Sequence, residues 1–154
     1  MLDTNIAIYV IKRRPVKALE IFNRHAGQLC ISTITVAELM HGVEKSAIPD
    51  HNLRQVEDFV SRLGTLDYGN KAAAHYGDIR ADLERKGKTI GVNDLHIAGH
   101  ARSEGLTLVT NNLKEFERVD GLRLENWVQV HKWGQSQVPH RNGVGVKCVD
   151  RKST

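Results

Sequence analysis

Residues 28–39 read QLCISTITVAEL, a short apolar run that passes directly into a helical pattern. The run at 28–32 follows Gly27 and ends at hydroxyl side chains, which is typical of a buried strand. From Thr33 to about Lys45 the pattern predicts a helix that carries Glu38. A buried strand that leads straight into a helix is the first half of a βαβ unit. The stretch therefore predicts an α/β fold.

Strands and helices continue to alternate along the rest of the chain. Residues 106–110 (LTLVT) predict a second buried strand, and residues 121–124 predict a last one. Helices are predicted near residues 4–14, 15–27, 53–63, 72–83, 94–103 and 111–117, with Asn93 as a cap and a loop through Pro49. This order implies a three-layer α/β/α domain with a mostly parallel central sheet and helices on both faces.

The length of 154 residues suits one domain that buries its core without disulfide or metal staples. We expect this domain at residues 1–128. Residues 129–154 lack periodicity and are rich in polar, glycine and basic residues, so we expect a disordered or loosely docked tail. Cys30 lies in an apolar run and Cys148 in the tail, and neither belongs to a C-x-x-C pair, so no disulfide framework is expected.

The composition favours a soluble protein with an anionic partner. The net charge is +4 and the isoelectric point about 9.2, which favours nucleic acid among other partners. Aromatic residues make up only 5% of the chain, so binding would depend on charge rather than on stacked bases. The sequence has no Gly-rich nucleotide loop, and no apolar run approaches the roughly 20 residues of a membrane span. Since no secretory signal is present at Met1, we expect a cytoplasmic protein.

Three acidic residues that are far apart in the sequence share one local setting. Asp3, Glu38 and Asp94 each stand near a point where an apolar stretch gives way to a helix. In parallel sheets the carboxyl ends of the strands lie at one edge, and ligands bind there. Carboxylates gathered at that edge repel one another unless a divalent cation or a proton compensates. The pattern therefore indicates metal-dependent chemistry.

Each of these acids also has a plainer structural explanation. Asp3 would cap a helix after a very short strand. Glu38 completes the capping-box pattern with Thr35, in which the glutamate side chain would return to a backbone amide. Asp94 would favour the positive end of a helix macrodipole. Each explanation is sound for one residue, but together they leave the shared setting of the three acids unexplained.

Two further patterns have both a functional and a structural interpretation. His96 and His100 have the spacing of paired zinc ligands on a helix, but the glutamate of the H-E-x-x-H motif is missing. We therefore expect these histidines to be partly buried or near the site entrance rather than to bind zinc. The basic runs at residues 12–14 and 85–88 stand at predicted helix ends, where they either complement the helix dipole or contact phosphate.

Four motifs taken together resemble those of the PIN-domain ribonucleases. They are residues 2–5 (LDTN), 32–39 (STITVAEL), 91–98 (GVNDLHIA) and 109–112 (VTNN). Within this superfamily the sequence is most similar to the VapC toxins of bacterial toxin–antitoxin modules. The likeness runs from residue 1 to about residue 128, and it is carried by the joint order of the motifs rather than by any one of them.

The resemblance implies a metal-dependent endoribonuclease that is restrained by an antitoxin. The metal would be Mg²⁺ or Mn²⁺, the substrate a structured RNA such as tRNA, and the partners a VapB-like antitoxin and a second copy in a homodimer. By position, Asp3, Glu38 and Asp94 match three family acids, with Asp3 and Asp94 as the metal ligands. Asn112 stands at a fourth catalytic position that is often acidic, so either its carbonyl oxygen or Glu115 completes the site.

The resemblance also suggests roles for individual residues, and two alternative functions stay open. Thr110 matches a hydroxyl that would orient the attacking water, and Glu38 would polarise that water or bind a second ion. Only Met1 and Leu2 precede Asp3, so we expect a shortened first strand that holds Asp3 less firmly. One rival is a noncatalytic RNA- or antitoxin-binding module, which would show no carboxylate-dependent Mn²⁺ binding. The other is a single-strand DNA nuclease, which competition with DNA would reveal.

Overall fold

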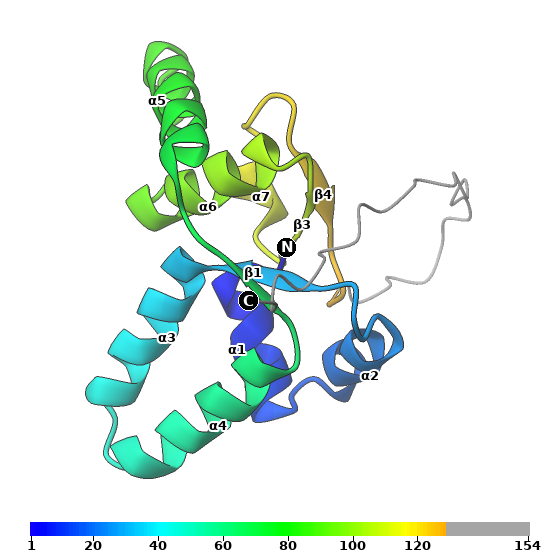
Figure 1. The fold of residues 1–154 in the computed structure, drawn as a ribbon. Coiled ribbons are helices and arrows are strands. Elements are labelled where there is room, and N and C mark those ends of the chain that lie inside the picture. The colour runs from blue at the N-terminus through cyan, green and yellow to red at the C-terminus, as the bar shows by residue number, and fades with distance from the viewer. Residues whose placement is uncertain (129–154) are drawn as a thin grey trace, which may run out of the picture.

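The strands lie in the middle of the molecule, between two groups of helices (Figure 1). The computed structural model describes residues 1–128, and the predicted tail at residues 129–154 lies outside them. The strands are β1 (Cys30–Ser32), β2 (Gly64–Leu66), β3 (Thr107–Val109) and β4 (Arg123–Glu125). The helices are α1 (Thr4–Lys12), α2 (Val16–Arg24), α3 (Thr33–Glu44), α4 (Pro49–Ser61), α5 (Asn70–Arg85), α6 (Val92–Ser103) and α7 (Leu113–Phe116). The expected α/β fold is confirmed.

Residues 1–3 join two parallel strand pairs at the centre of the fold. β1 pairs with β2, and β3 pairs with β4, each in parallel register. Leu2 N–H donates to the Cys30 carbonyl at 2.8 Å, and Asp3 N–H donates to the Val109 carbonyl at 2.9 Å. The amino group of Met1 donates to the Thr107 carbonyl at 2.8 Å. The expectation that a short first strand holds Asp3 loosely is therefore wrong, because the backbone around Asp3 is bonded on both sides.

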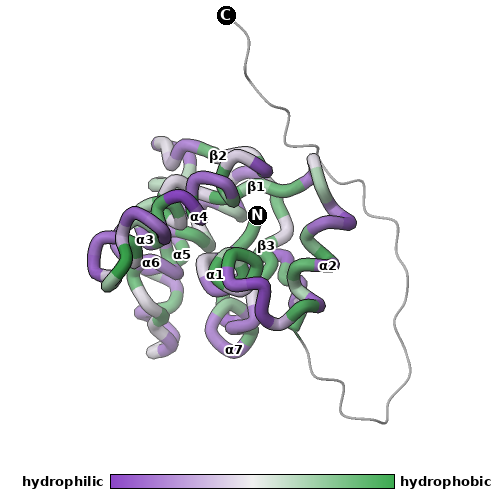
Figure 2. Tube along the Cα trace, turned by 90° about the horizontal axis from the view of Figure 1, so that it is seen from below, coloured by the Kyte–Doolittle hydropathy of each residue, from purple (hydrophilic) through white to green (hydrophobic). Residues whose placement is uncertain are grey.

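Successive strand residues alternate between two apolar cores, as the pleat of a strand requires. One core contains α1, α2, α3 and α4, and the strand residues that face it are Leu2, Ile31 and Val109. The other contains α5, α6 and α7, and the strand residues that face it are Met1, Cys30 and Leu108. Figure 2 shows the N-terminus in the interior beside the apolar segments of β1 and β3. The sheet is thus the middle layer of three.

Helices α5 and α6 pack so closely that their crossing requires a glycine. A Cβ atom on Gly99 would lie 2.9 Å from the Tyr76 backbone nitrogen and 3.1 Å from the Ala72 carbonyl oxygen. The two helices would have to separate to admit any side chain there. The contact fixes α6, which carries Asp94 in its first turn. Within residues 1–128, none of the helices combines the length and the apolar character needed to cross a membrane.

Three local features differ from the sequence prediction. The pattern does not predict β2, because Gly64, Thr65 and Leu66 are too few and too polar to stand out, and the strand is defined by its pairing with β1. Helix α6 begins at Val92 with Gly91 as its N-cap, so Asn93 lies inside the first turn instead of capping it. Pro49 is the first residue of α4 rather than part of a loop, a position that suits its fixed φ angle and missing N–H.

Candidate active site

Asp3 is held in a fixed orientation at the carboxyl edge of the sheet. Its Oδ1 accepts a hydrogen bond from Thr4 N–H at 2.8 Å, so it does cap α1, and its Oδ2 accepts one from Thr110 Oγ1 at 2.8 Å. Burial raises the pKa of Asp3 above its usual value, these two hydrogen bonds oppose that rise, and the charges of Glu38 and Glu115 add to it. Asp3 is therefore a buried, oriented carboxylate in a negative environment.

The Thr110 hydroxyl contacts Asp3 directly. It donates to the Asp3 carboxylate and accepts a hydrogen bond from Asn112 N–H at 3.0 Å. Since a hydroxyl has one proton to donate, this arrangement commits that proton to Asp3. In this structure Thr110 positions the carboxylate, and its predicted contact with the attacking water stays a prediction.

Glu38 is also held by a hydroxyl, this time from α1. Thr4 Oγ1 donates to Glu38 Oε1 at 2.7 Å, and the buried Thr35 Oγ1 lies 3.3 Å from Thr4 Oγ1. The capping-box explanation for Glu38 is wrong, because the N-cap of α3 is Ser32, whose hydroxyl accepts from Ile34 N–H at 3.1 Å. The Glu38 side chain is thus directed to the site and not to the backbone of its own helix.

Asp94 lies in the electrostatic field of the other acids. Its pKa is raised to about 7, first by burial, then by the charge of Asp3, a hydrogen bond with Glu115, and the charges of Glu115 and Glu38. Asp94 therefore keeps its proton to a higher pH than a free aspartate does. The structure thus brings together the three predicted acids and adds Glu115 from α7.

Asn112 contacts the site through its backbone. It is the N-cap residue of α7, its side chain makes no capping hydrogen bond, and its backbone N–H contacts Thr110. Of the two explanations left open by the sequence for the fourth position, the geometry favours Glu115, which interacts with both Asp3 and Asp94. Sequence reasoning missed the role of Thr4, whose hydroxyl holds Glu38.

Asp3, Glu38 and Asp94 open onto a cavity of about 300 Å³ between α1, α3 and the start of α6. Its lining residues are Asp3, Thr4, Asn5, Ile8, Glu38, His41, Gly42, Lys45, Asn93 and Asp94. Carboxylate oxygens are the donors that Mg²⁺ and Mn²⁺ prefer, so the donor set fits a hard divalent cation. Within residues 1–128, no three His, Cys, Asp or Glu side chains already stand in a ligating arrangement. The hydrogen bond between Asp94 and Glu115 would have to open to admit a cation.

The two histidines of α6 serve structural contacts. His100 is buried, and its Nδ1 lies 2.8 Å from Ser32 Oγ, the cap of α3. His96 Nδ1 lies 2.8 Å from the Tyr68 hydroxyl, and its ring stacks on Tyr76 at 4.2 Å. Burial lowers the pKa of both histidines, which favours the neutral ring. These contacts are consistent with the expectation that His96 and His100 do not form a zinc site.

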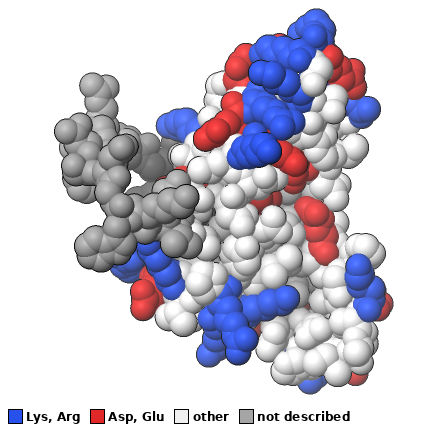
Figure 3. Space-filling model, turned by 180° about the vertical axis from the view of Figure 1, so that it is seen from behind, with Lys and Arg blue, Asp and Glu red and all other residues white. Residues whose placement is uncertain are grey.

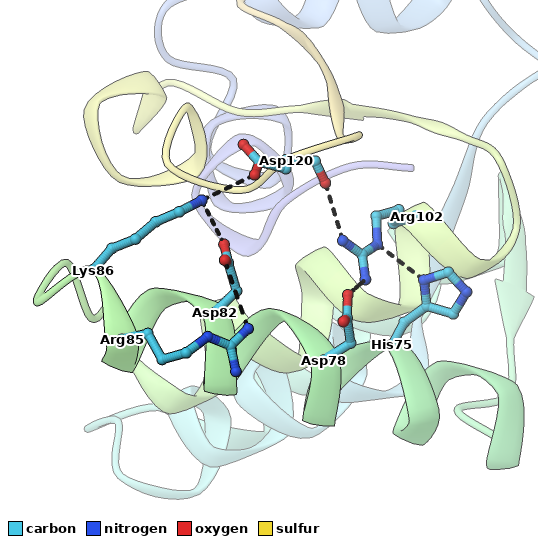
Figure 4. A network of polar contacts seen from close by, with 7 residues as sticks. All are labelled: His75, Asp78, Asp82, Arg85, Lys86, Arg102 and Asp120. Carbon is cyan, nitrogen blue, oxygen red and sulfur yellow. Dashed lines mark hydrogen bonds and ion pairs between the residues drawn. The ribbon is translucent and has the colours of Figure 1, made fainter.

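The basic residues at the end of α5 are paired with carboxylates. Lys86 bridges Asp82 and Asp120, at 2.7 and 2.9 Å, and Arg85 lies 3.8 Å from Asp82. Figure 4 shows these pairs next to Arg102, which binds Asp78, His75 and the Asp120 carbonyl. The same interleaving of both charges is visible over the surface at the top of Figure 3. These contacts tie α5 and α6 to the turn before β4 and favour the structural interpretation for Lys86, and a phosphate contact by residues 85–88 stays a prediction.

Known proteins resemble this chain over nearly its whole described length. Residues 1–122 match the PIN domain family. Ribonuclease VapC2 of Haemophilus influenzae is 64% identical over 128 residues, which cover 83% of this chain and 97% of that protein. The tRNA(fMet)-specific endonuclease VapC of Shigella flexneri is 55% identical over 127 residues, covering 82% and 96%. The crystal structure of DNA-bound VapBC from Salmonella typhimurium matches with a TM-score of 0.80 and 54% identity, covering 83% of this chain and 97% of that one.

Proposed function

This chain belongs to the VapC family of PIN-domain ribonucleases, and on that premise we propose that it cleaves tRNA(fMet) with a divalent cation held at the acidic cluster. The observation that carries the proposal is the meeting of Asp3, Glu38, Asp94 and Glu115 from four separate elements, which raises the pKa of Asp94 to about 7. A protein gains no stability from such repulsion, so the cluster is better explained by chemistry than by folding.

The residues divide into metal ligands and positioning groups. We assign Asp3 and Asp94 as the ligands of Mg²⁺ or Mn²⁺, with Glu115 as a further donor in place of the Asn112 side chain. When bound, the cation would lower the pKa of a water and stabilise negative charge on the phosphate. Glu38, oriented by Thr4, would polarise the attacking water.

The substrate and partner follow from relatives that cover almost the same length. The Shigella flexneri relative is a tRNA(fMet)-specific endonuclease, and its 55% identity supports the same RNA class for this chain. The matching Salmonella typhimurium structure is a VapBC complex, which supports a VapB-type antitoxin as the partner. A tRNA substrate would support the expected cytoplasmic location. The homodimer implied by the family likeness stays a prediction, which light scattering of the purified chain tests.

Cleavage of a tRNA(fMet) transcript by the purified chain tests the proposal. With Mg²⁺ or Mn²⁺ we expect discrete products that disappear in EDTA, in Asp3→Ala and in Asp94→Asn. Glu117→Gln is the matched control, because Glu117 is an exposed acid next to α7 that is not among the charges acting on Asp3 or Asp94. Cleavage that persists in EDTA or in Asp94→Asn would refute the assignment of the site. Stronger competition by single-strand DNA than by RNA would refute the substrate class.

A further inference from the structure

The cavity at the acidic cluster has a second wall that the cation chemistry does not use. Four of its lining residues follow the spacing i, i+3, i+4 and i+7: Glu38, His41 and Gly42 lie in α3, and Lys45 is its C-cap with helical backbone angles. This spacing places them on one face of the helix. Glu38 is at the acidic end, and Lys45 stands about two turns further along the same face. We call His41, Gly42 and Lys45 the α3 strip.

The charge along this helix face changes sign. The inner end carries the carboxylates, which repel an anion until a cation compensates. Lys45 at the outer end is exposed, and no carboxylate within residues 1–128 forms an ion pair with it, in contrast to Lys86 and Arg102. His41, also exposed, adds an imidazole beside it. A polyanion that enters the cavity would therefore meet its attractive contact at Lys45.

Gly42 has no structural reason to be a glycine. It lies inside α3, where glycine weakens a helix relative to alanine, and a Cβ atom built on it would meet nothing within 4 Å. Gly99 of α6, by contrast, is required by close packing. At Gly42 the missing side chain leaves the helix backbone bare toward the cavity, which permits a close approach by a ligand.

We propose that the α3 strip binds the sugar–phosphate backbone of the RNA beside the scissile phosphate. Lys45 pairs with a neighbouring phosphate, and the bare backbone at Gly42 lets the strand lie against the helix. The amides of Asn5 and Asn93, on other walls of the cavity, supply hydrogen-bonding groups for the ribose or base. This inference rests on the proposed ribonuclease function and names the surface that holds its substrate.

Binding of fluorescein-labelled tRNA(fMet) to the full chain in EDTA, followed by anisotropy over a range of salt concentrations, tests the role of Lys45. We expect Lys45→Ala to raise Kd about threefold to tenfold, and to reduce the slope of log Kd against log salt by about 0.7, since one phosphate contact is lost. Lys45→Arg should keep both values. Lys17→Ala on α2, an exposed lysine outside the cavity, should match the wild type.

A second pair of variants tests Gly42, with an expected gain in thermal stability together with a loss of RNA binding. Gly42→Leu should raise Tm by about 2–4 °C, because leucine is a good helix former, and should weaken RNA binding at least threefold. Gly77→Leu is the matched control: Gly77 is also inside a helix with nothing within 4 Å of its Cβ position, but it lies outside the cavity. It should gain similar stability and keep the wild-type Kd.

The outcomes separate this inference from the function on which it rests. If the wild type cleaves the transcript while Lys45→Ala and Gly42→Leu bind it as the wild type does, the α3 strip is not the RNA surface. If those variants instead lose only the capture of a VapB-type antitoxin, the strip is a protein interface and the proposal fails. If the wild type neither binds nor cleaves the transcript, the proposed function itself fails.

Discussion

Replacing Asp94 by asparagine should make the protein more stable at neutral pH and inactive at the same time. The amide keeps the size of the side chain but removes a carboxyl group whose pKa is close to 7. Burial and the neighbouring acids raise the pKa of Asp94 to about 7, so above that pH the native wild type holds mutually repelling charges. The variant has no charge at this position and so avoids that repulsion. It also lacks one of the proposed ligands of the cation.

The size of the effect follows from the pKa. A native pKa of about 7 against 3.8 for free aspartate corresponds to roughly 4 kcal/mol if no solvent screening applies. Because Asp94 is only half-buried, screening reduces this to about 2 kcal/mol, or roughly 6 °C in Tm. The raised pKa means that the native state keeps a proton that the unfolded state releases. This contribution to stability is therefore present below about pH 4 and is lost as the pH rises to 7.

Thermal unfolding of both proteins in EDTA from pH 4 to pH 8 measures this effect. The half-buried His96 and the buried His100 act in the opposite direction, because their lowered pKa values favour stability at higher pH. The difference between the two proteins is therefore the useful quantity. We expect the variant and wild type to unfold together near pH 4 and the variant to gain about 6 °C by pH 7.5. Excess Mn²⁺ should close the gap by stabilising the wild type. A flat difference, or a variant less stable at pH 7.5, would refute the reasoning.

Three further substitutions test contacts around the site. Thr4→Val should lower kcat roughly 10- to 100-fold in tRNA cleavage assays with little loss of fold, because Glu38 loses its 2.7 Å hydrogen bond, and Thr4→Ser should restore the rate. Gly99→Ala should destabilise the protein by about 1–3 kcal/mol in urea unfolding, because its Cβ would lie 2.9 Å from a backbone nitrogen of α5. His100→Leu should cost about 1–2 kcal/mol in the same assay, from the lost contact with the cap of α3, and should leave kcat unchanged.

Each of these predictions has an outcome that contradicts it. A Thr4→Val enzyme with the wild-type rate would show that Glu38 needs no orientation by α1. A stable Gly99→Ala protein would mean that α5 and α6 separate freely. Loss of cleavage by a well-folded His100→Leu protein would mean that His100 takes part in catalysis.

The sequence was sufficient for the parts of the fold that depend on local pattern. Residues 28–32 and 106–110 are apolar on both faces, because their side chains alternate between two cores, and this continuous character predicts buried parallel strands. β2 lacked such a signal because it is a peripheral strand with partly exposed residues that is defined by its register with β1. The central position of residues 1–3 also depends on long-range hydrogen bonds, from Met1 to Thr107 and from Asp3 to Val109.

In the candidate site, too, some residues could be predicted from local pattern and others depend on tertiary contacts. Asp3, Glu38 and Asp94 stand near strand ends or helix starts, so a pattern along the chain was enough to select them. The choice between Ser32 and Thr35 as the cap of α3 depends on which residue first adopts helical backbone angles, and hydroxyl spacing does not contain that information. The contribution of Glu115 depends on how α7 approaches α6, which is a tertiary contact.

The rigidity of Asp3 explains why the repulsion appears at Asp94. The backbone of Asp3 is fixed by the sheet, and its carboxylate by Thr4 and Thr110, so this group cannot move away from the other acids. Asp94, half-buried at the start of α6, responds instead by keeping its proton up to a pKa of about 7. A proton and a divalent cation thus compete for the same carboxylates. Cation affinity should therefore rise steeply between pH 5 and 7.5 with release of a proton, and calorimetry with Mn²⁺ in buffers of different ionisation enthalpy measures that release.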